Sequence, residues 1–288
     1  MRPWFIRRSG QAREQGAWSG SDAYRVVAAG LLLTMGLLIG PSSPSGGYSA
    51  GGYDVSYPNC RATSYPGGFA IVGVGGGRPF TANHCWTNEW QRSLNTAVVA
   101  STPSSPSIYF NTGYASAYSK VITRYCQGHS SNAPTPPPGT STRAGNTELV
   151  AWEIGCSEAD YATGLIVANR VTPFMWWADV EPANSWSEDT TINQFTIDGL
   201  IWRMSQPVLP GGTNVIPGGF YSTPYAWKTI VGSNSYTSSS LVPPITAQWE
   251  ASSGCSPFYS SSPSSLASPT PYLTQVDAPS GIDLDSGC

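Results

Sequence analysis

Residues 174–182 (FMWWADVEP) constrain the fold of this chain more than any other segment. An apolar run that ends in two carboxylates and a proline indicates a short buried strand, because proline stops further strand pairing. Side chains alternate across a strand, so Trp177, Asp179 and Glu181 share one face. In a barrel of parallel strands, acids at the carboxyl end of a strand lie at the mouth where active sites form. The segment therefore predicts an active site at such a mouth. The alternative is a helix-capping Asp179 beside a solvated Glu181.

Other segments supply strands and helices for a barrel. Residues 69–74 (FAIVGV) form a continuous β-branched run, which is typical of a strand buried on both faces of a parallel sheet. Helical spacing follows at 86–97 and 190–205. A further helix is expected at 157–169, with Ser157 as its N-cap. Shorter strands are predicted at 53–56, 107–111, 220–223, 245–250, 272–277 and 281–285, and a short helix at 225–231. This order predicts an α/β fold, an irregular TIM-type (β/α) barrel of about eight strands whose late strands lack full helices.

The first 47 residues differ from the rest in composition. Five arginines precede residue 26, an apolar run fills residues 26–40, and a stretch rich in Pro, Ser and Gly follows at 41–47. This layout is typical of a secretory signal, and the apolar run is short for a membrane span. We expect residues 1–47 to be a signal peptide or N-terminal anchor with a linker, and residues 48–288 to form one secreted domain. Because no clear A-x-A cleavage site is present, an uncleaved membrane anchor at 26–40 is the alternative.

The six cysteines indicate disulfides rather than a metal site. No pair has the C-x-x-C spacing of zinc or redox sites, and the chain has only two histidines. We expect neighbours along the chain to pair, because each such bond closes a local excursion, including a long inserted loop at 114–147. The expected pairs are Cys60 with Cys85, Cys126 with Cys156, and Cys255 with Cys288. No metal or other cofactor is expected. The alternative is six buried thiols in a cytosolic protein.

Charge excludes two classes of partner. Only 11% of residues are charged, which suits an extracellular, loop-rich protein. The net charge is −3, and removal of residues 1–25, with five arginines and two acids, leaves 9 basic and 15 acidic side chains, or −6. Such a domain has no electrostatic footprint for nucleic acid and is not attracted to anionic lipid. A monomer is expected, with membrane contact only through an uncleaved N-terminal segment.

Six short motifs in barrel order resemble a known family. They are Asp54-Val55-Ser56, residues 69–73, Asp179-Val180-Glu181, Gly219-Phe220-Tyr221-Ser222, Gln275-Val276 and Ile282-Asp283-Leu284-Asp285. Over about residues 52–288 the chain resembles the lysozyme-like glycoside hydrolases of family 25, and more closely the related secreted bacterial glycoside-hydrolase-like domains. The resemblance implies an irregular barrel and peptidoglycan glycan strands as the substrate. The chain departs from the family at 57–60 (YPNC), where muramidases carry a Gln, and in the loop at 114–147.

The resemblance also implies roles for individual residues. Glu181 is expected to protonate the glycosidic oxygen, and Asp179 to stabilise the developing positive charge or to orient the substrate's N-acetyl group. The expected substrate-binding residues are Asp54, Asp283, Tyr221, Gln275, Trp177 and Trp249, the two tryptophans as stacking platforms. Glycoside cleavage needs one protonated and one ionised carboxyl, and crowded acids beside apolar walls raise one another's pKa. A catalytically silent barrel that binds glycan or serves as a cell-surface structural domain is the alternative.

Overall fold

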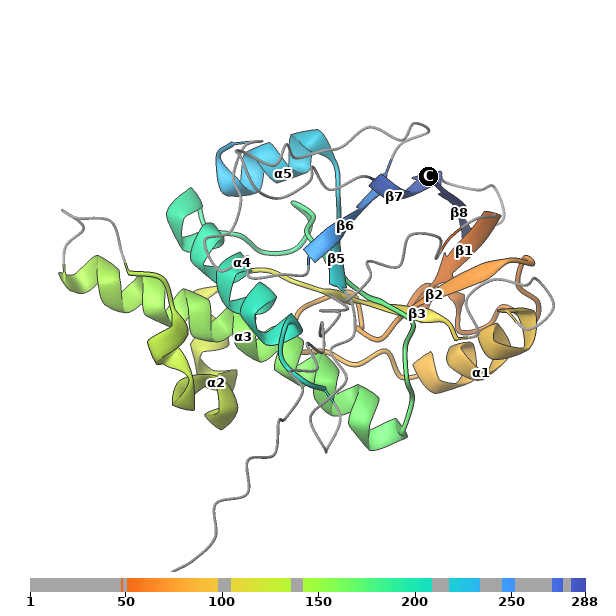
Figure 1. Ribbon diagram of the computed structural model, residues 1–288, viewed down its shortest axis with the longest axis horizontal. Coiled ribbons are helices and arrows are strands. Elements are labelled where there is room, and N and C mark those ends of the chain that lie inside the picture. The colour runs from red at the N-terminus through yellow and green to blue at the C-terminus, as the bar shows by residue number, and fades with distance from the viewer. Residues whose placement is uncertain are drawn as a thin grey trace, which may run out of the picture. The chain divides into compact units, whose positions relative to one another are not determined.

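Eight strands form a closed barrel in the computed structural model of this chain (Figure 1). Strands β1 to β7 are parallel, and β8 runs antiparallel to both β7 and β1. The strands are β1 (Gly51–Val55), β2 (Phe69–Gly73), β3 (Ser107–Asn111), β4 (Trp176–Asp179), β5 (Gly218–Ser222), β6 (Ile245–Glu250), β7 (Pro271–Val276) and β8 (Asp283–Gly287). The predicted eight-stranded barrel of mixed α/β content is confirmed.

The structure describes most of the region predicted to be the exported domain. The described residues are 48, 51–97, 105–135, 142–208, 218–233, 245–251, 271–276 and 281–288. The predicted signal or anchor segment at 26–40 lies outside them. Within the described part of the chain, no helix is both long enough and apolar enough to cross a membrane.

The helices follow the early strands. They are α1 (Trp86–Ala97), α2 (Arg124–Gly128), α3 (Thr142–Asn169), α4 (Thr190–Met204) and α5 (Pro224–Val231), with 3-10 turns at Tyr57–Asn59, Ser116–Val121 and Ser130–Asn132. Side-chain caps fix three of the starts. Thr123 accepts from the Cys126 N–H at α2, Asp189 from the Thr191 N–H at α4 and Thr223 from the Ala226 N–H at α5. Gly232 ends α5 in the left-handed conformation that glycine adopts most readily. The helices predicted at 86–97, 190–205 and 225–231 are confirmed.

The prediction for α3 was wrong at its start. The helix begins at Thr142 rather than at 157, and Ser157 lies inside it. The Ser157 hydroxyl donates to the Glu153 carbonyl oxygen at 2.7 Å and accepts from the Thr123 N–H at 3.0 Å. The expected loop at 114–147 therefore contains α2, two 3-10 turns and the first residues of α3. The serine ties this excursion to the helix rather than capping it.

Close packing of α3 against α4 accounts for the extra length. A Cβ atom at Gly155 would lie 1.8 Å from the Thr196 carbonyl oxygen, and one at Gly199 would lie 1.9 Å from that of Trp152. Because both positions lack a Cβ, the two backbones touch. The contact buries side chains along both helices, which offsets the cost of glycine within a helix.

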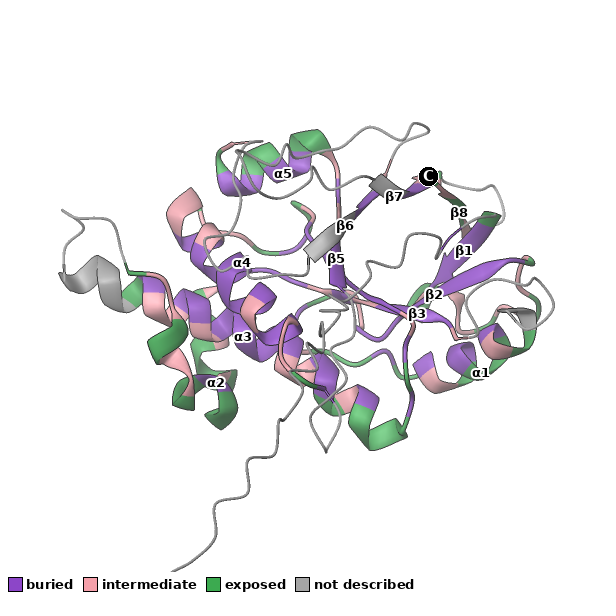
Figure 2. Ribbon diagram, viewed as in Figure 1, coloured by how far each residue is buried: buried purple, intermediate pink, exposed green. Residues whose placement is uncertain are grey.

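Strands β1 to β5 are buried on both faces for most of their length, and Figure 2 shows β1, β2 and β5 mostly purple. On the outward face of β4, Trp176, Ala178 and Val180 join the core that includes apolar residues of α3 and α4. On the inward face, Trp177 packs in the barrel interior with Phe69, Ile71, Met175, Trp249, Leu273 and Tyr48. The predicted alternation across residues 174–182 is therefore confirmed, with its apolar side chains divided between two cores.

Tyr48 closes the amino end of the barrel. Its ring lies against Phe69, the first residue of β2, and against Phe174, which precedes β4. Its hydroxyl hydrogen-bonds the hydroxyl of Ser107, the first residue of β3, and accepts from Trp177 Nε1 at 3.3 Å. Strands β2, β3 and β4 thus begin around one buried tyrosine.

Two of the predicted disulfides are confirmed. Cys60 bonds Cys85, and Cys126 bonds Cys156. Cys288 is also disulfide-bonded, whereas Cys255 lies outside the described residues. Disulfides persist in oxidising compartments, so these bonds are compatible with an extracellular protein.

Candidate active site

Asp179 and Glu181 lie together at the carboxyl end of β4. Asp179 is the last residue of the strand and is buried, whereas Glu181 is half-buried. Their carboxyl groups lie close enough for each to shift the pKa of the other. Burial, followed by the charge of Glu181, holds the pKa of Asp179 well above its ordinary value. Burial also raises the pKa of Glu181, while the hydrogen bond from Asp179 lowers it. Two adjacent carboxyls that are both held out of water disfavour ionising together.

Backbone contacts fix the turn that carries Glu181. The Glu181 carbonyl oxygen accepts from Trp186 Nε1 at 2.8 Å and from the Asn184 N–H at 3.1 Å. The Asp179 carbonyl oxygen accepts from the Thr112 hydroxyl at 2.7 Å. Thr112 directly follows the neighbouring strand β3, so that strand also holds this turn. These contacts orient both acids before any ligand binds.

Asn111 contacts the acid pair from the neighbouring strand. It ends β3 opposite Asp179, and its Nδ2 donates to Asp179 Oδ2 at 2.5 Å. This hydrogen bond lowers the pKa of Asp179 and so opposes part of the effect of burial. Sequence reasoning did not select Asn111, although it ends its strand as Asp179 ends β4.

Asp54 joins the site from β1. Gln275 Nε2 of β7 donates to Asp54 Oδ2 at 2.6 Å, and the Tyr221 hydroxyl of β5 donates to Gln275 Oε1 at 2.5 Å. Burial, followed by the charges of Asp283 and Glu181, raises the pKa of Asp54 to about 7, while the hydrogen bond from Gln275 opposes the rise. Burial is also the main cause that raises the pKa of Tyr221, and the charges of Glu181, Asp179 and Asp54 add to it.

Asp283 completes the acidic group. It is half-buried and lies directly opposite Asp54 in the pairing of β8 with β1. The four acids predicted from the sequence thus come to one end of the barrel, together with Tyr221 and Gln275. The four are Asp54, Asp179, Glu181 and Asp283.

The two predicted stacking tryptophans have a different location. Trp177 is 0% exposed and Trp249 2% exposed. Their rings lie edge to face with centroids 5.8 Å apart inside the barrel. Strand alternation puts Trp177 on the same face as Asp179 but one layer deeper, so its ring offers no surface to a ligand. The expected role of both residues as sugar platforms is at odds with this burial. They form the apolar floor beneath the acids.

Sequence reasoning also missed Asp285. Its side chain is buried, and Oδ1 accepts from Trp249 Nε1 at 2.9 Å. Burial, followed by the charge of Asp54, holds the pKa of Asp285 well above its ordinary value. The signal was available, because residues 283 and 285 share one face of a strand. Asp285 therefore lies within electrostatic reach of Asp54 but is bonded to Trp249 in the barrel interior.

One cluster of possible metal ligands occurs among the described residues. Cys60, His84 and Cys85 have ligand atoms within 4.8 Å of one another. Both sulfur atoms belong to the same disulfide, so they are not thiolates and do not coordinate a metal in this state. The candidate catalytic group among the described residues is therefore the set of acids at the barrel mouth.

Comparison of the chain with protein-family models, with curated proteins and with solved structures gives no match.

Proposed function

We propose that this protein is a secreted O-glycosyl hydrolase that cleaves bacterial cell-wall glycan by carboxylate acid catalysis. The adjacent pair of Asp179 and Glu181 carries the proposal, because at the end of β4 it lies near two further acids, Asp54 and Asp283. Peptidoglycan as the substrate, and a TIM-type barrel related to family 25, rest on the order of the sequence motifs. The closed barrel with acids at the carboxyl ends of parallel strands supports both.

Glu181 is the acid in this proposal. It is the more exposed of the pair, and a glycan chain that covers it removes water and raises its pKa further. A proton retained by the two acids is then carried by Glu181, which delivers it to the glycosidic oxygen as the bond to the leaving sugar breaks.

Asp179 is the electrostatic partner. After proton transfer it is a carboxylate held by Asn111, and it faces the positive charge that develops on the sugar ring. Asp54 and Asp283 add negative potential from the opposite side of the mouth. An oxocarbenium-like centre is stabilised by such a field.

A catalytically silent barrel that binds glycan or has a structural role is the second candidate. It is favoured by the hydrogen bonds that link Tyr221, Gln275 and Asp54 to one another. Because these polar atoms already bond each other, they are less available to bind a substrate. The buried tryptophans favour it as well.

Reducing ends released from purified peptidoglycan and from chitooligosaccharides test the proposal. The wild-type protein is expected to release them, and Glu181→Gln to abolish the release. Glu188→Gln is a matched control, because Glu188 is an exposed acid outside the site. No turnover on either polymer would contradict the proposal, as would full activity of Glu181→Gln. Saturable glycan binding without turnover, unchanged in Glu181→Gln, would support the second candidate.

A further inference from the structure

Three possible metal ligands meet where the turn after β1 approaches the start of α1. Cys60, His84 and Cys85 bring two sulfur atoms and one ring nitrogen within 4.8 Å of one another. The Cys60–Cys85 disulfide engages both sulfur atoms, so the cluster binds no metal while that bond is intact. Reduction turns the same two atoms into thiolates, which are strong ligands of zinc. The redox state of one disulfide therefore decides whether this cluster can bind a metal.

The distances within the cluster fit a tetrahedral zinc ion. With bonds of about 2.3 Å to sulfur and about 2.0 Å to nitrogen, two such ligands of one zinc lie about 3.5 Å apart. Cys60 Sγ lies 3.5 Å from His84 Nε2. Two thiolates on one zinc lie about 3.8 Å apart, so once the disulfide is broken Cys85 Sγ has to turn away from Cys60 Sγ. One pair of ligands is therefore already at its coordination distance.

Asn83 brings an oxygen atom to the same place. Its Oδ1 lies 3.1 Å from Cys85 Sγ and 3.9 Å from Cys60 Sγ. A sulfur and an oxygen ligand of one tetrahedral zinc lie about 3.6 Å apart, which is between these two distances. The Cys85 N–H donates to this oxygen at 3.0 Å and holds it in position. The amide oxygen, or a water beside it, completes a four-coordinate metal.

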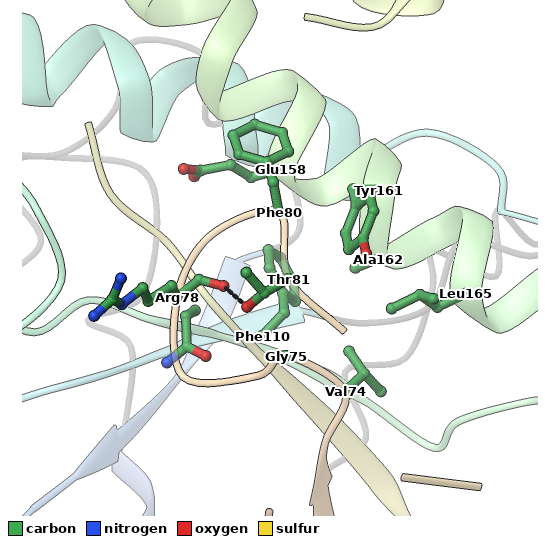
Figure 3. Close-up of a pocket in the computed structure, with 11 residues that line it drawn as sticks. Val74, Gly75, Arg78, Phe80, Thr81, Phe110, Glu158, Tyr161, Ala162 and Leu165 are labelled. Carbon is green, nitrogen blue, oxygen red and sulfur yellow. Dashed lines mark hydrogen bonds between the residues drawn. The ribbon is translucent and has the colours of Figure 1, made fainter. Parts of the chain in front are cut away.

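The loop between β2 and the cluster is held independently of the disulfide. Within it, the Thr81 hydroxyl donates to the Arg78 carbonyl oxygen at 2.7 Å (Figure 3). The Asn83 N–H donates to the Val74 carbonyl oxygen at 2.9 Å, and Asn83 Nδ2 donates to that of Gly73 at 2.8 Å. Opening of the disulfide therefore leaves the end of this loop, which leads into the ligands, anchored to β2.

A buried carboxyl group beside the cluster favours a bound cation. Glu89 lies in the first turn of α1, and its Oε2 accepts from Asn83 Nδ2 at 2.6 Å. Its Oε1 has no hydrogen-bond partner among the described residues. Arg92 and His84 are the positive groups within electrostatic reach of this carboxyl. A cation on His84 adds to them and offsets the cost of burying the carboxylate.

Access favours reduction of this disulfide over the bond between α2 and α3. Cys60 is half-buried, whereas Cys126 and Cys156 are both 0% exposed. Attack of a thiolate on Cys60 expels Cys85 Sγ, and Cys85 directly precedes the first residue of α1. The helix dipole stabilises a thiolate at a helix N-terminus, so Cys85 is a good leaving group. A reductant can thus reach and open the Cys60–Cys85 bond while the other bond is covered.

We propose that reduction by a dithiol converts the Cys60–Cys85 disulfide into a zinc site whose ligands are Cys60, His84 and Cys85. One thiolate of the dithiol attacks Cys60 Sγ, and the sulfur–sulfur bond breaks with its electron pair on Cys85. The second thiol of the reductant displaces Cys60, so the dithiol leaves as a disulfide and its two protons pass to solvent. The two protein thiolates then neutralise the charge of Zn²⁺. No acid of the barrel mouth takes part, so the site is independent of the proposed glycosidase activity.

Cobalt(II) binding tests the site, because thiolate ligands give Co²⁺ an absorption that Zn²⁺ lacks. The full chain is reduced with dithiothreitol, separated from it without oxygen and titrated with Co²⁺. A thiolate-to-cobalt absorption that Zn²⁺ abolishes is expected. His84→Ala should weaken binding at least about tenfold, and His129→Ala is the matched control because His129 is the other histidine of the chain. No such absorption in the reduced wild type, or equal binding by the two variants, would overturn the proposal.

Two further measurements apply even if reduction loosens the fold. Zinc should raise the thermal denaturation temperature of the reduced wild type but not that of reduced His84→Ala. Alkylation after brief reduction, followed by mass spectrometry, should label Cys60 and Cys85 before Cys126 and Cys156. Stability that zinc leaves unchanged, or the reverse order of labelling, would contradict the proposal.

Discussion

Gln275 Nε2 donates to Asp54 Oδ2 at 2.6 Å and so joins two residues that lie 221 positions apart in the chain. The bond crosses from β7 to β1 over β8, so it ties the last parallel strand to the first one. It also opposes the effect of burial on the pKa of Asp54.

Loss of that bond should raise the pKa of Asp54. In Gln275→Leu the carboxylate loses its amide donor, and the pKa is expected to move above about 7, because burial and the nearby acids then act without opposition. The ¹³C titration of the Asp54 carboxyl measures the shift. Tyr221→Phe is the control, because it removes a hydroxyl from Gln275 but leaves the amide on Asp54. An unchanged or lower pKa in Gln275→Leu would contradict the assigned role of the bond.

The free energy of unfolding should fall as the pH rises from about 4 to about 7. The pKa of Asp54 is raised from 3.8 to about 7, so the folded state binds its proton more tightly than the unfolded state does. The resulting stability is complete below about pH 4 and is lost as the pH rises to about 7, by at most about 4 kcal/mol. Urea denaturation at several pH values measures this slope. Asp54→Asn should have a shallower slope, and an increase in wild-type stability over the same range would rule out the proposed burial effect.

The acid pair should respond to single substitutions in different ways. Glu181→Gln is expected to lower kcat about a hundredfold or more, because it removes the proton donor. Asp179→Asn should also lower kcat, since the amide cannot face the developing charge with a negative one. The rate of release of reducing ends across pH measures both. An Asp179→Asn variant with the wild-type rate and pH profile would show that Glu181 acts alone.

Trp177 should matter for stability rather than for glycan contact. Its side chain is fully buried among Phe69, Trp249 and other interior residues, so Trp177→Ala is expected to cost about 3 to 5 kcal/mol of unfolding free energy. Trp177→Phe keeps an aromatic ring and should fold and bind glycan nearly as the wild type does. Denaturation and a glycan-binding assay measure the two effects. Loss of binding by a stably folded Trp177→Phe would restore the expected role as a platform.

The Cys60–Cys85 disulfide should stabilise the loops around Asp54. It ties the turn after β1 to the start of α1, and Asn59 Nδ2 in that turn donates to the Gly281 carbonyl oxygen at 2.8 Å, just before β8. Replacing both cysteines is expected to cost about 3 kcal/mol, because the bond closes a loop of 25 residues. Thermal denaturation measures the loss. The Cys126→Ala, Cys156→Ala double variant is the control for a disulfide between α2 and α3. Because only the Cys60–Cys85 bond holds the loops around Asp54, its removal should raise the KM for glycan more than removal of the Cys126–Cys156 bond does. A larger rise of KM in the Cys126→Ala, Cys156→Ala variant would contradict this role of the Cys60–Cys85 bond.

Local patterns in the sequence were sufficient for most of the barrel. The strands at 107–111 and 245–250 and the helix at 86–97 have the predicted bounds, because apolar periodicity and flanking turn residues agree at those places. The start of α3 could not be predicted in this way. Gly145 and Gly155 lower its helix propensity, and contact with α4, which the sequence does not display, compensates.

The sequence predicts which face of a strand each site residue occupies, but it does not predict how deeply that residue is buried in the barrel. Alternation puts Asp179 and Glu181 on one face, but it does not say that Trp177 lies below the solvent-accessible layer. The roles of Asn111 and Asp285 depend on which residues of neighbouring strands stand opposite each other. That register is set by closure of the whole barrel and is not written in any single segment.

The buried Tyr48 has a consequence for presentation of the site. It enters the barrel among the first residues of the parallel strands, whereas the acids stand at their last residues. The polypeptide that leads into this domain therefore joins it at the pole opposite the acids.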